Sequence, residues 1–131
     1  MIKKVLITGS NTGIGFEFAK YFMDNGFGVI AHYDNENENL NKIKKNGMNE
    51  CIHCDFSDDN AFNNFLQKVK SMQIEALVNN AGMYDFSKNK SNRIKSIEKV
   101  IKVNLIAPVL LSEVVMDGMK KRKHGHIINI S

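Results

Sequence analysis

The chain has 131 residues, of which 43% are hydrophobic and 24% are charged, with one proline and two cysteines. This length and composition are typical of one folded domain and exclude a disordered or collagen-like chain. The formal net charge is +4, partly gathered in the basic run 120–123, and no apolar run approaches the roughly 18 residues of a membrane span, so neither nucleic acid nor a membrane is an expected partner. Two cysteines three residues apart make no disulfide framework, which predicts a cytoplasmic location.

Short apolar runs alternate along the chain with longer segments of helical periodicity, which is typical of a parallel α/β sheet. The pattern predicts strands over 5–7, 29–33, 50–54, 76–78 and 126–130, and helices over 14–25, 40–46, 58–71 and about 94–121. The third of these helices begins at a cap that is either Ser57 or Asp58. Gly26, Gly47 and Gly125 follow helices and are expected to end them. The polar stretches 34–39 and 87–93 are candidates for flexible loops.

Two of the predicted helices each carry one apolar face. Their inward residues are Phe18, Ala19, Phe22 and Met23 in the first, and Phe62, Phe65, Leu66 and Val69 in the third.

A glycine-rich turn, residues 8–15, joins the first strand to the first helix in the spacing G-x-x-x-G-x-G. Glycines let the backbone turn tightly and approach a phosphate, and the N–H groups at a helix start attract an anion. The spacing differs from the dinucleotide fingerprint G-x-G-x-x-G and lacks the lysine of a P-loop. We expect a pyrophosphate to be held by Gly9, Ser10, Asn11, Gly13, Ile14 and Gly15, the alternative being a turn without a ligand.

Small residues also follow the fourth strand, where Asn80, Ala81 and Gly82 stand at the end of a parallel strand. Ligands of open α/β sheets bind in the crevice at that edge, although N-x-G runs are also common turns. Within the last helix, Pro108 lies four residues after Asn104 and has no N–H to offer its carbonyl. We expect a kink that leaves the Asn104 carbonyl free, the alternative being an incidental proline kink.

Four motifs in order make the sequence resemble the short-chain dehydrogenase/reductase family. They are the glycine turn, Asp55 after the third strand, the run Asn79-Asn80-Ala81-Gly82, and Asn104 in Val103-Asn104-Leu105. The stretch 119–130 is most similar to the 3-oxoacyl-carrier-protein-reductase type. The resemblance implies a Rossmann-type doubly wound parallel sheet of order 3-2-1-4-5, truncated after strand five, so that residues 1–131 form an incomplete NAD(P)-binding domain.

The resemblance also implies roles for single residues. Asp55 and Phe56 would meet the adenine of the cofactor, and the carbonyl of Asn104 would hold a water of the proton relay. The catalytic serine of the family would come one residue after Ser131, or be Ser131 itself if the alignment shifts by one. The catalytic tyrosine and lysine, spaced Y-x-x-x-K, would follow later still.

Y-x-x-x-K also occurs from Tyr84 to Lys88. It precedes the serine and lies on no predicted helix, so we interpret it as a coincidence of spacing.

The nature of the nicotinamide cofactor depends on the end of the second strand, where a carboxylate accepts from a ribose hydroxyl and a basic side chain pairs with a 2′-phosphate. Asp34 stands about there, while the family's usual acidic position is occupied by Tyr33. Thr12 replaces a basic residue that NADP-binding members often carry. The sequence therefore favours NAD over NADP, with Asp34 pointing to solvent as the alternative.

Two further clusters invite other readings. Cys51 and Cys54 have a spacing seen in metal sites, but on a strand they point to opposite faces and no second ligand pair exists, so no metal is expected. The basic run 120–123 closes a helix, where cations complement the helix dipole.

The predicted function is hydride transfer between NAD(P) and a small carbonyl or secondary alcohol, in an enzyme that is a homo-oligomer by resemblance. Since the tyrosine and lysine are not among these residues, we expect no turnover from the chain alone. A nucleotide-binding or interaction module without catalysis, and an inactive truncated fragment, are the alternatives.

Overall fold

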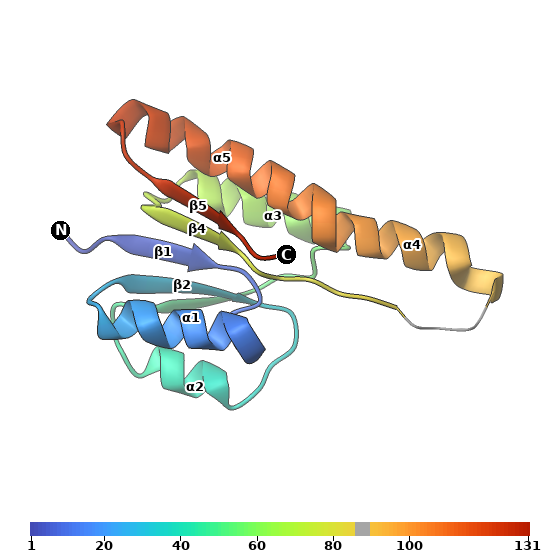
Figure 1. The fold of residues 1–131 in the computed structure, drawn as a ribbon, viewed down its shortest axis with the longest axis horizontal. Helices are drawn as coiled ribbons and strands as arrows, with labels where there is room; N and C mark the ends of the chain where they lie inside the picture. The colour runs from blue at the N-terminus through green and yellow to red at the C-terminus, as the bar shows by residue number, and fades with distance from the viewer. Residues whose placement is uncertain (86–89) are drawn as a thin grey trace.

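The computed structural model describes residues 1–85 and 90–131, and the fold alternates strands and helices from end to end (Figure 1). The strands are β1 (Lys4–Ile7), β2 (Gly28–Tyr33), β3 (Glu50–His53), β4 (Ala76–Asn79) and β5 (His126–Asn129). The helices are α1 (Gly13–Asp24), α2 (Asn39–Lys44), α3 (Asp59–Lys70), α4 (Arg93–Ile101) and α5 (Ala107–Arg122), with a 3-10 turn at Lys90–Asn92 and a π-helical segment at Lys102–Ile106.

All neighbouring strands pair in parallel, in the order β3-β2-β1-β4-β5, which confirms the predicted topology. Helices α1 and α2 cover one face of the sheet, and α3 and α5 cover the other, while α4 extends beyond the edge of the sheet (Figure 1). Strand β1 lies at the centre and pairs with β2 and β4. The loops that leave the carboxyl ends of these strands therefore meet at one edge.

Alternation along the strands builds a core on each face. Leu6 packs with the layer of α3 and α5, whereas Val5 and Ile7 pack with the layer of α1. The predicted apolar faces of α1 and α3 are confirmed: Ala19 and all four predicted residues of α3 are buried, and the other three of α1 are partly buried against the core. The side chain of Asp58 accepts from the N–H of Ala61, so the open choice of cap for α3 is settled as Asp58.

Helix ends agree with the predictions in part. Gly26 has a φ of +82° and ends α1 in the left-handed conformation, as expected. Helix α2 already ends at Lys44, so the prediction that Gly47 closes it is wrong. At the end of α5 the left-handed residue is Lys123, with a φ of 58°, and not Gly125. Gly125 instead leaves space for a neighbour, since a Cβ there would lie 2.3 Å from Cγ of Met119.

The predicted single helix over 94–121 is interrupted. The segment Lys102–Ile106 is π-helical, and the N–H of Ala107 donates to the carbonyl of Lys102 five residues earlier. Pro108, in the first turn of α5, cannot donate a main-chain hydrogen bond, which favours such a change of pattern. The interruption predicted from the proline is therefore present, but its form is a π-turn.

No helix in the described part of the chain is long and apolar enough to cross a membrane.

Arg122, in the basic run at the end of α5, has a structural contact. Nη2 of Arg122 donates to the carbonyl of Ile74, 2.7 Å away, which joins the end of α5 to the loop before β4. The neighbouring lysines 120, 121 and 123 are exposed to solvent at this end of the helix.

Candidate functional site

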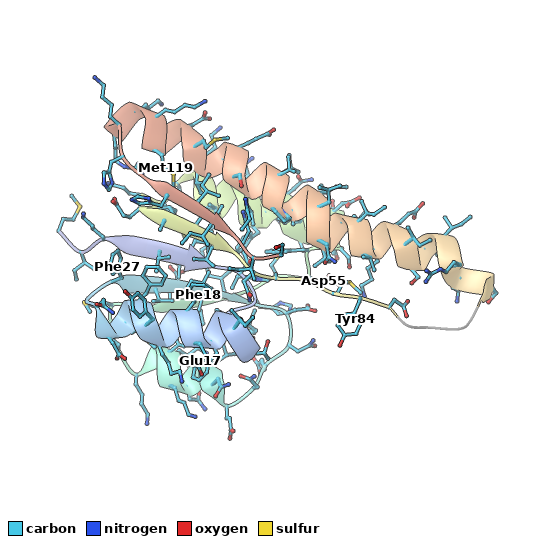
Figure 2. The ribbon with its side chains drawn as sticks, in the orientation of Figure 1. Glu17, Phe18, Phe27, Asp55, Tyr84 and Met119 are labelled. Atoms are coloured by element: carbon cyan, nitrogen blue, oxygen red, sulfur yellow. The ribbon has the colours of Figure 1, made fainter. Side chains whose placement is uncertain are left out.

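A cleft of about 360 Å³ lies at the carboxyl edge of the sheet. Figure 2 shows Asp55 at this edge of the sheet, whereas Met119 lies far from it, near the carboxyl end of α5. Eight of the residues predicted to bind a ligand line the cleft: Gly9, Asn11, Asp34, Asp55, Phe56, Asn80, Ala81 and Gly82. Ser10 does not line it, and neither do Gly13, Ile14 and Gly15, which begin α1.

Close approaches in the glycine turn explain two of its glycines. Gly9 has a φ of +61°, a conformation that costs any residue with a Cβ, and a Cβ there would lie 3.0 Å from Cα of Ala81. At Gly15 a Cβ would lie only 2.0 Å from the carbonyl oxygen of Gly9. The start of α1 thus packs directly against the main chain of the turn, which places the free N–H groups of the first helical turn beside it.

Thr8 and Asn80 fasten the turn to the end of β4. Oγ1 of Thr8 accepts from the main-chain N–H groups of Asn80 and Ala81, both at 2.9 Å. In return, Nδ2 of Asn80 donates to the carbonyls of Thr8 at 3.2 Å and Gly9 at 3.1 Å. The two segments predicted separately as ligand-binding are therefore one hydrogen-bonded unit.

His32, on β2, was not predicted as a site residue, yet it fastens the turn from the other side. The N–H of Gly9 donates to its Nδ1 at 3.1 Å, and the N–H and Oγ of Ser10 both donate to its carbonyl, at 2.9 and 2.8 Å. The main-chain N–H groups of Gly9 and Ser10 are therefore both bonded to His32 within the protein. Ser10 is fully buried and bonded to the carbonyl of His32, and its direct contact with a pyrophosphate stays a prediction.

The partners of His32 define its protonation state. Because the carbonyl of Cys54 lies 2.8 Å from Nε2 and can only accept, Nε2 carries the hydrogen, and Nδ1 is the acceptor for Gly9. The imidazole is thus neutral. Burial lowers the pKa of His32 from 6.5 to about 4, against the opposing hydrogen bond to Cys54 and with some repulsion from His53. The ring also stacks on Phe56, with centroids 3.9 Å apart.

The polar stretch after β2 is held against the turn by asparagine side chains. Nδ2 of Asn11 donates to the carbonyl of Asn35 at 2.7 Å. The carbonyl of Asn11 accepts from Nδ2 of Asn37 at 2.6 Å and of Asn39 at 3.0 Å. The first candidate for a flexible loop is therefore anchored to the glycine turn. Of the second candidate, residues 87–89 lie outside the described residues and 90–92 form the 3-10 turn.

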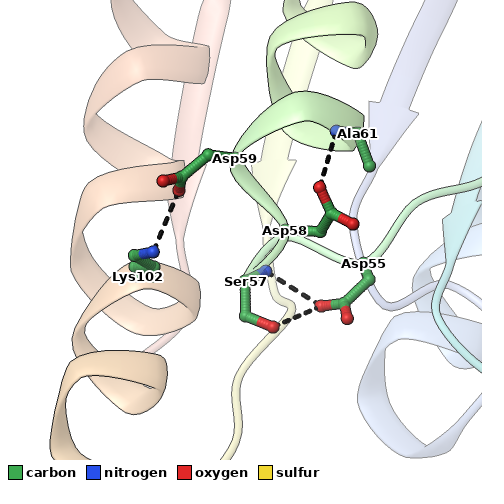
Figure 3. Close-up of polar contacts among 6 residues, drawn as sticks. All are labelled: Asp55, Ser57, Asp58, Asp59, Ala61 and Lys102. Atoms are coloured by element: carbon green, nitrogen blue, oxygen red, sulfur yellow. Dashed lines mark hydrogen bonds and ion pairs between the residues drawn. The ribbon is translucent and has the colours of Figure 1, made fainter. Parts of the chain in front are cut away.

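Asp55 presents a carboxylate to the cleft from the end of β3. Its Oδ1 accepts from the N–H of Ser57 at 2.9 Å and from the hydroxyl at 2.7 Å (Figure 3). These bonds, led by the hydroxyl, lower the pKa of Asp55 below its ordinary value, with a smaller contribution from Lys99. The group is ionised near neutral pH, and its second oxygen takes no part in these bonds.

Two neighbours of Asp55 hold this corner in place. Asp58 caps α3, and Asp59 forms an ion pair with Nζ of Lys102 at 3.0 Å, which joins α3 to the π-turn (Figure 3). Phe56 is only 5% exposed, because its ring packs between His32 and the phenyl rings of α3. Most of Phe56 therefore belongs to the core, although the residue still contributes to the lining of the cleft.

Asn104 lies in the π-turn and binds the segment after β4. Its Oδ1 accepts from the N–H of Met83 and its Nδ2 donates to the carbonyl of Met83, both at 2.7 Å. Its amide is thus engaged with the main chain, beside the cleft that Met83 and Val103 help to line. Tyr84, the first residue of the Y-x-x-x-K match, lies in this segment on no helix, and Lys88 lies outside the described residues.

The ends of β4 and β5 are joined by side chains. Nδ2 of Asn79 donates to Oδ1 of Asn129 at 2.9 Å and to the hydroxyl of Ser112 at 3.2 Å. The N–H of Ile130 then donates to the carbonyl of Asn79. Ser131 follows β5 at the same carboxyl edge as Asn80, and it is exposed.

The two cysteines lie on opposite faces of the sheet, as predicted. Cys51 packs with the layer of α1 and Cys54 with the layer of α3. Burial raises the pKa of both thiols, to about 11 for Cys54. Among the described residues, no group of three or more histidine, cysteine or acidic side chains is arranged to hold a metal ion.

Comparison with known proteins places this edge in context. Residues 3–131 match the family model described as short chain dehydrogenase. A 3-oxoacyl-(acyl-carrier-protein) reductase of Buchnera aphidicola subsp. Schizaphis graminum is 31% identical over 98% of this chain and 54% of its own length. The chain thus spans about half the length of the curated relatives it matches.

Two solved structures are similar over 98% of the chain. A 4-hydroxyisoleucine dehydrogenase complexed with NADH has a TM-score of 0.85 and 33% identity over 54% of its own chain. A metagenomic short-chain oxidoreductase in complex with NADP has a TM-score of 0.83 and 29% identity, over 61% of its chain.

Proposed function

The chain belongs to the short-chain dehydrogenase family, and from that premise we propose that it forms the cofactor-binding half of an NAD(P)-dependent oxidoreductase. The reaction would move a hydride between the nicotinamide and a small carbonyl or secondary alcohol. The observation that carries the proposal is the glycine turn, which hydrogen bonds hold beside the cleft. The ionised carboxylate of Asp55, in the loop after β3, lines the same cleft. A dinucleotide needs both features, one for its pyrophosphate and one for its adenosine.

Each part of the cofactor has matching groups on this chain. The first N–H groups of α1, from Gly13 to Gly15, suit the pyrophosphate, because they have no partner within the helix and lie at the positive end of its dipole. The second oxygen of Asp55 suits the adenine amino group, and Phe56 offers its main chain beside it. The small residues at Ala81 and Gly82 leave room for the nicotinamide ribose. The bound cofactor itself supplies or receives the hydride.

We propose NAD as the preferred form of the cofactor. Asp34 lines the cleft at the end of β2, where a carboxylate repels a 2′-phosphate. The lysine that lines the described part of the cleft, Lys99, comes from α4 and is close enough to Asp55 to lower its pKa. Relatives with either NADH or NADP bound have this fold, so the preference rests on Asp34.

For the chemical step, Asn104 and Ser131 are the proposed contributors from this chain. Asn104 fixes Met83 through its amide, and its carbonyl in the π-turn is the proposed site of the relay water. Ser131 stands at the edge where the family's serine is expected. Because the family's tyrosine and lysine are not matched within these residues, the proposal includes no turnover for the 131 residues alone.

Association of two copies is a further part of the proposal. Apolar side chains lie exposed along the helical column at Ile94, Ile97, Ile101, Leu105, Ile106 and Val109. Exposed apolar patches of this kind mark protein interfaces. Multi-angle light scattering of the chain would show a dimer or larger assembly, and a monomer at all concentrations would refute this part.

Titration with NADH and NADPH tests the cofactor proposal. We expect both to raise the melting temperature, since a ligand of the folded state stabilises it, with NADH binding at least several-fold tighter. Asp34→Arg should reverse the preference, and Glu36→Arg in the same loop, outside the cleft lining, is the matched control. Absence of any shift with millimolar dinucleotide would refute the proposal.

A further inference from the structure

A buried histidine stands between the pyrophosphate side and the adenosine side of the proposed cofactor site. His32 is 2% exposed, with Gly9 bonded to one ring nitrogen and Cys54 to the other. Gly9 is the first glycine of the turn, and Cys54 directly precedes Asp55 and Phe56. One imidazole therefore joins two loops that come from different strands.

We propose that His32 is a positioning residue for cofactor binding, whose neutral ring holds the Gly9 N–H inward and so sets the glycine turn in its binding conformation. The inference rests on the proposed function, because it assigns His32 a part in the same dinucleotide site. His32 has no direct contact with the cofactor in this scheme. It acts through Gly9 on one side and through Cys54 and Phe56 on the other.

The geometry of Gly9 shows why one acceptor matters. Its N–H is held by Nδ1 of His32 and its carbonyl by Nδ2 of Asn80, so both peptide groups that flank its left-handed φ are fixed. The carbonyl also lies against Gly15 at the start of α1. Without the acceptor, the Gly9 N–H would be an unpaired donor in the protein interior and would rotate to find a partner. Rotation of that peptide would move the Gly9 backbone, against which Gly15 packs at the start of α1.

The adenosine side is coupled through the same ring. His32 stacks on Phe56 with an angle of 12° between the rings, and it meets Phe65 of α3 edge-on at 5.4 Å. Its Nε2–H also fixes the carbonyl of Cys54, one residue before Asp55. The titratable neighbour that acts on the ring is His53, on the adjacent strand.

Three variants separate these contacts. In His32→Asn, the amide oxygen can stand near the place of Nδ1 and accept from Gly9, while the bond to Cys54 is lost. In His32→Gln, the longer amide reaches the place of Nε2 and keeps the bond to Cys54, while the acceptor for Gly9 is lost. His32→Phe keeps the ring stack and loses both bonds. Asn and Gln each remove one hydrogen bond, so a purely structural role predicts the same effect for both.

Two readouts are needed: the dissociation constant for NADH, and the hydrogen-exchange rate of the Gly9 amide by NMR without cofactor. We expect His32→Gln and His32→Phe, which lose the acceptor for the Gly9 N–H, to weaken NADH binding about tenfold, and His32→Asn, which keeps that acceptor, to stay within about threefold. The Gly9 amide should exchange slowly in the wild type and in His32→Asn, and at least tenfold faster in the other two.

The outcomes distinguish the two proposals. Equal NADH affinity in the Asn and Gln variants, or an unchanged Gly9 exchange rate in His32→Gln, would overturn the role of His32. If the wild type binds no dinucleotide, the proposed function fails, and the exchange pattern still decides whether His32 holds the turn. If the variants do not fold, a Gly9 amide that exchanges in the wild type as fast as exposed loop amides would overturn the inference.

Discussion

Acidification tests the burial of a neutral His32 through the stability of the whole chain. The pKa of His32 is lowered from 6.5 to about 4 in the folded protein, mainly because burial penalises the charged ring. Between those two values the unfolded chain binds a proton that the folded chain does not. The free energy of unfolding therefore rises with pH through this window: the contribution of His32 is complete above pH 6.5 and is lost as the pH falls towards 4.

The size of the effect follows from the separation of the two pKa values. At about 1.4 kcal/mol per pH unit, the shift of His32 corresponds to roughly 3 kcal/mol of unfolding free energy lost between neutral pH and pH 4. That is a large part of the 5–15 kcal/mol typical of a domain. Asp55, whose pKa is lowered, acts in a separate window, because its contribution is lost only below its ordinary value of 3.8.

Urea denaturation at half-unit steps from pH 4 to pH 7 measures this slope. We expect the wild type to take up nearly one proton on unfolding around pH 5, and His32→Phe, which cannot titrate, to lose that uptake whatever its stability at pH 7. His126→Phe is the matched control, since His126 is exposed and lies on β5, which β1 and β4 separate from β2. A slope in His32→Phe equal to that of the wild type would refute the reasoning.

Three other substitutions test the framework of the site, each by urea denaturation at pH 7. Thr8→Val should lower the free energy of unfolding by about 1–3 kcal/mol, because it leaves two main-chain N–H groups after β4 without their acceptor. Thr8→Ser keeps the hydroxyl and should lose less than half as much. Equal losses in the two variants would contradict the role of the hydroxyl. Gly15→Ala should destabilise the protein by about 1–3 kcal/mol or more, because the added Cβ would overlap the carbonyl of Gly9. Gly47→Ala, where no atom lies near the added methyl group, is the control and should be neutral or slightly stabilising. A neutral Gly15→Ala would count against the close approach of Gly15 to Gly9. Asn104→Ala should cost about 1–2 kcal/mol through the loss of both bonds to Met83, and Asn104→Asp, which keeps only the acceptor, should fall between; an Asp variant as stable as the wild type would show that the donor contributes nothing.

Much of the fold and of the site was predictable because the relevant signals are local. The alternation of apolar runs and helical periodicity identified all five strands, and a glycine-rich segment between a strand and a helix marked the turn at Gly9. The form of the break near Pro108 was not predictable in the same way. A proline removes one donor, but whether the helix kinks or adopts a π-turn depends on packing against other segments, here including the ion pair from Asp59 to Lys102.

His32 was missed because its role comes entirely from distant partners. Gly9 and Cys54 are 23 and 22 residues away in the sequence, and only the parallel pairing of β2 with β1 and β3 brings them to the two ring nitrogens. On its own, a histidine in an apolar strand indicates only a buried and hydrogen-bonded side chain. The same limit applies to the hydrogen bond from the Ser10 hydroxyl to the carbonyl of His32, which also joins residues distant in the sequence.

The glycine turn is held from three sides, and this arrangement bears on how a ligand would bind. Thr8 and Asn80 fix it to β4, His32 fixes it to β2, and Asn11 fixes it to the loop after β2. Ordering a free backbone costs roughly 1–2 kcal/mol of conformational free energy per residue. A turn that folding has already ordered does not lose this free energy again when a ligand binds. The affinity for a dinucleotide should therefore depend as strongly on these buried contacts as on the groups that touch the ligand. Substitutions at Thr8 and His32 would then weaken binding without removing a single contact to the cofactor.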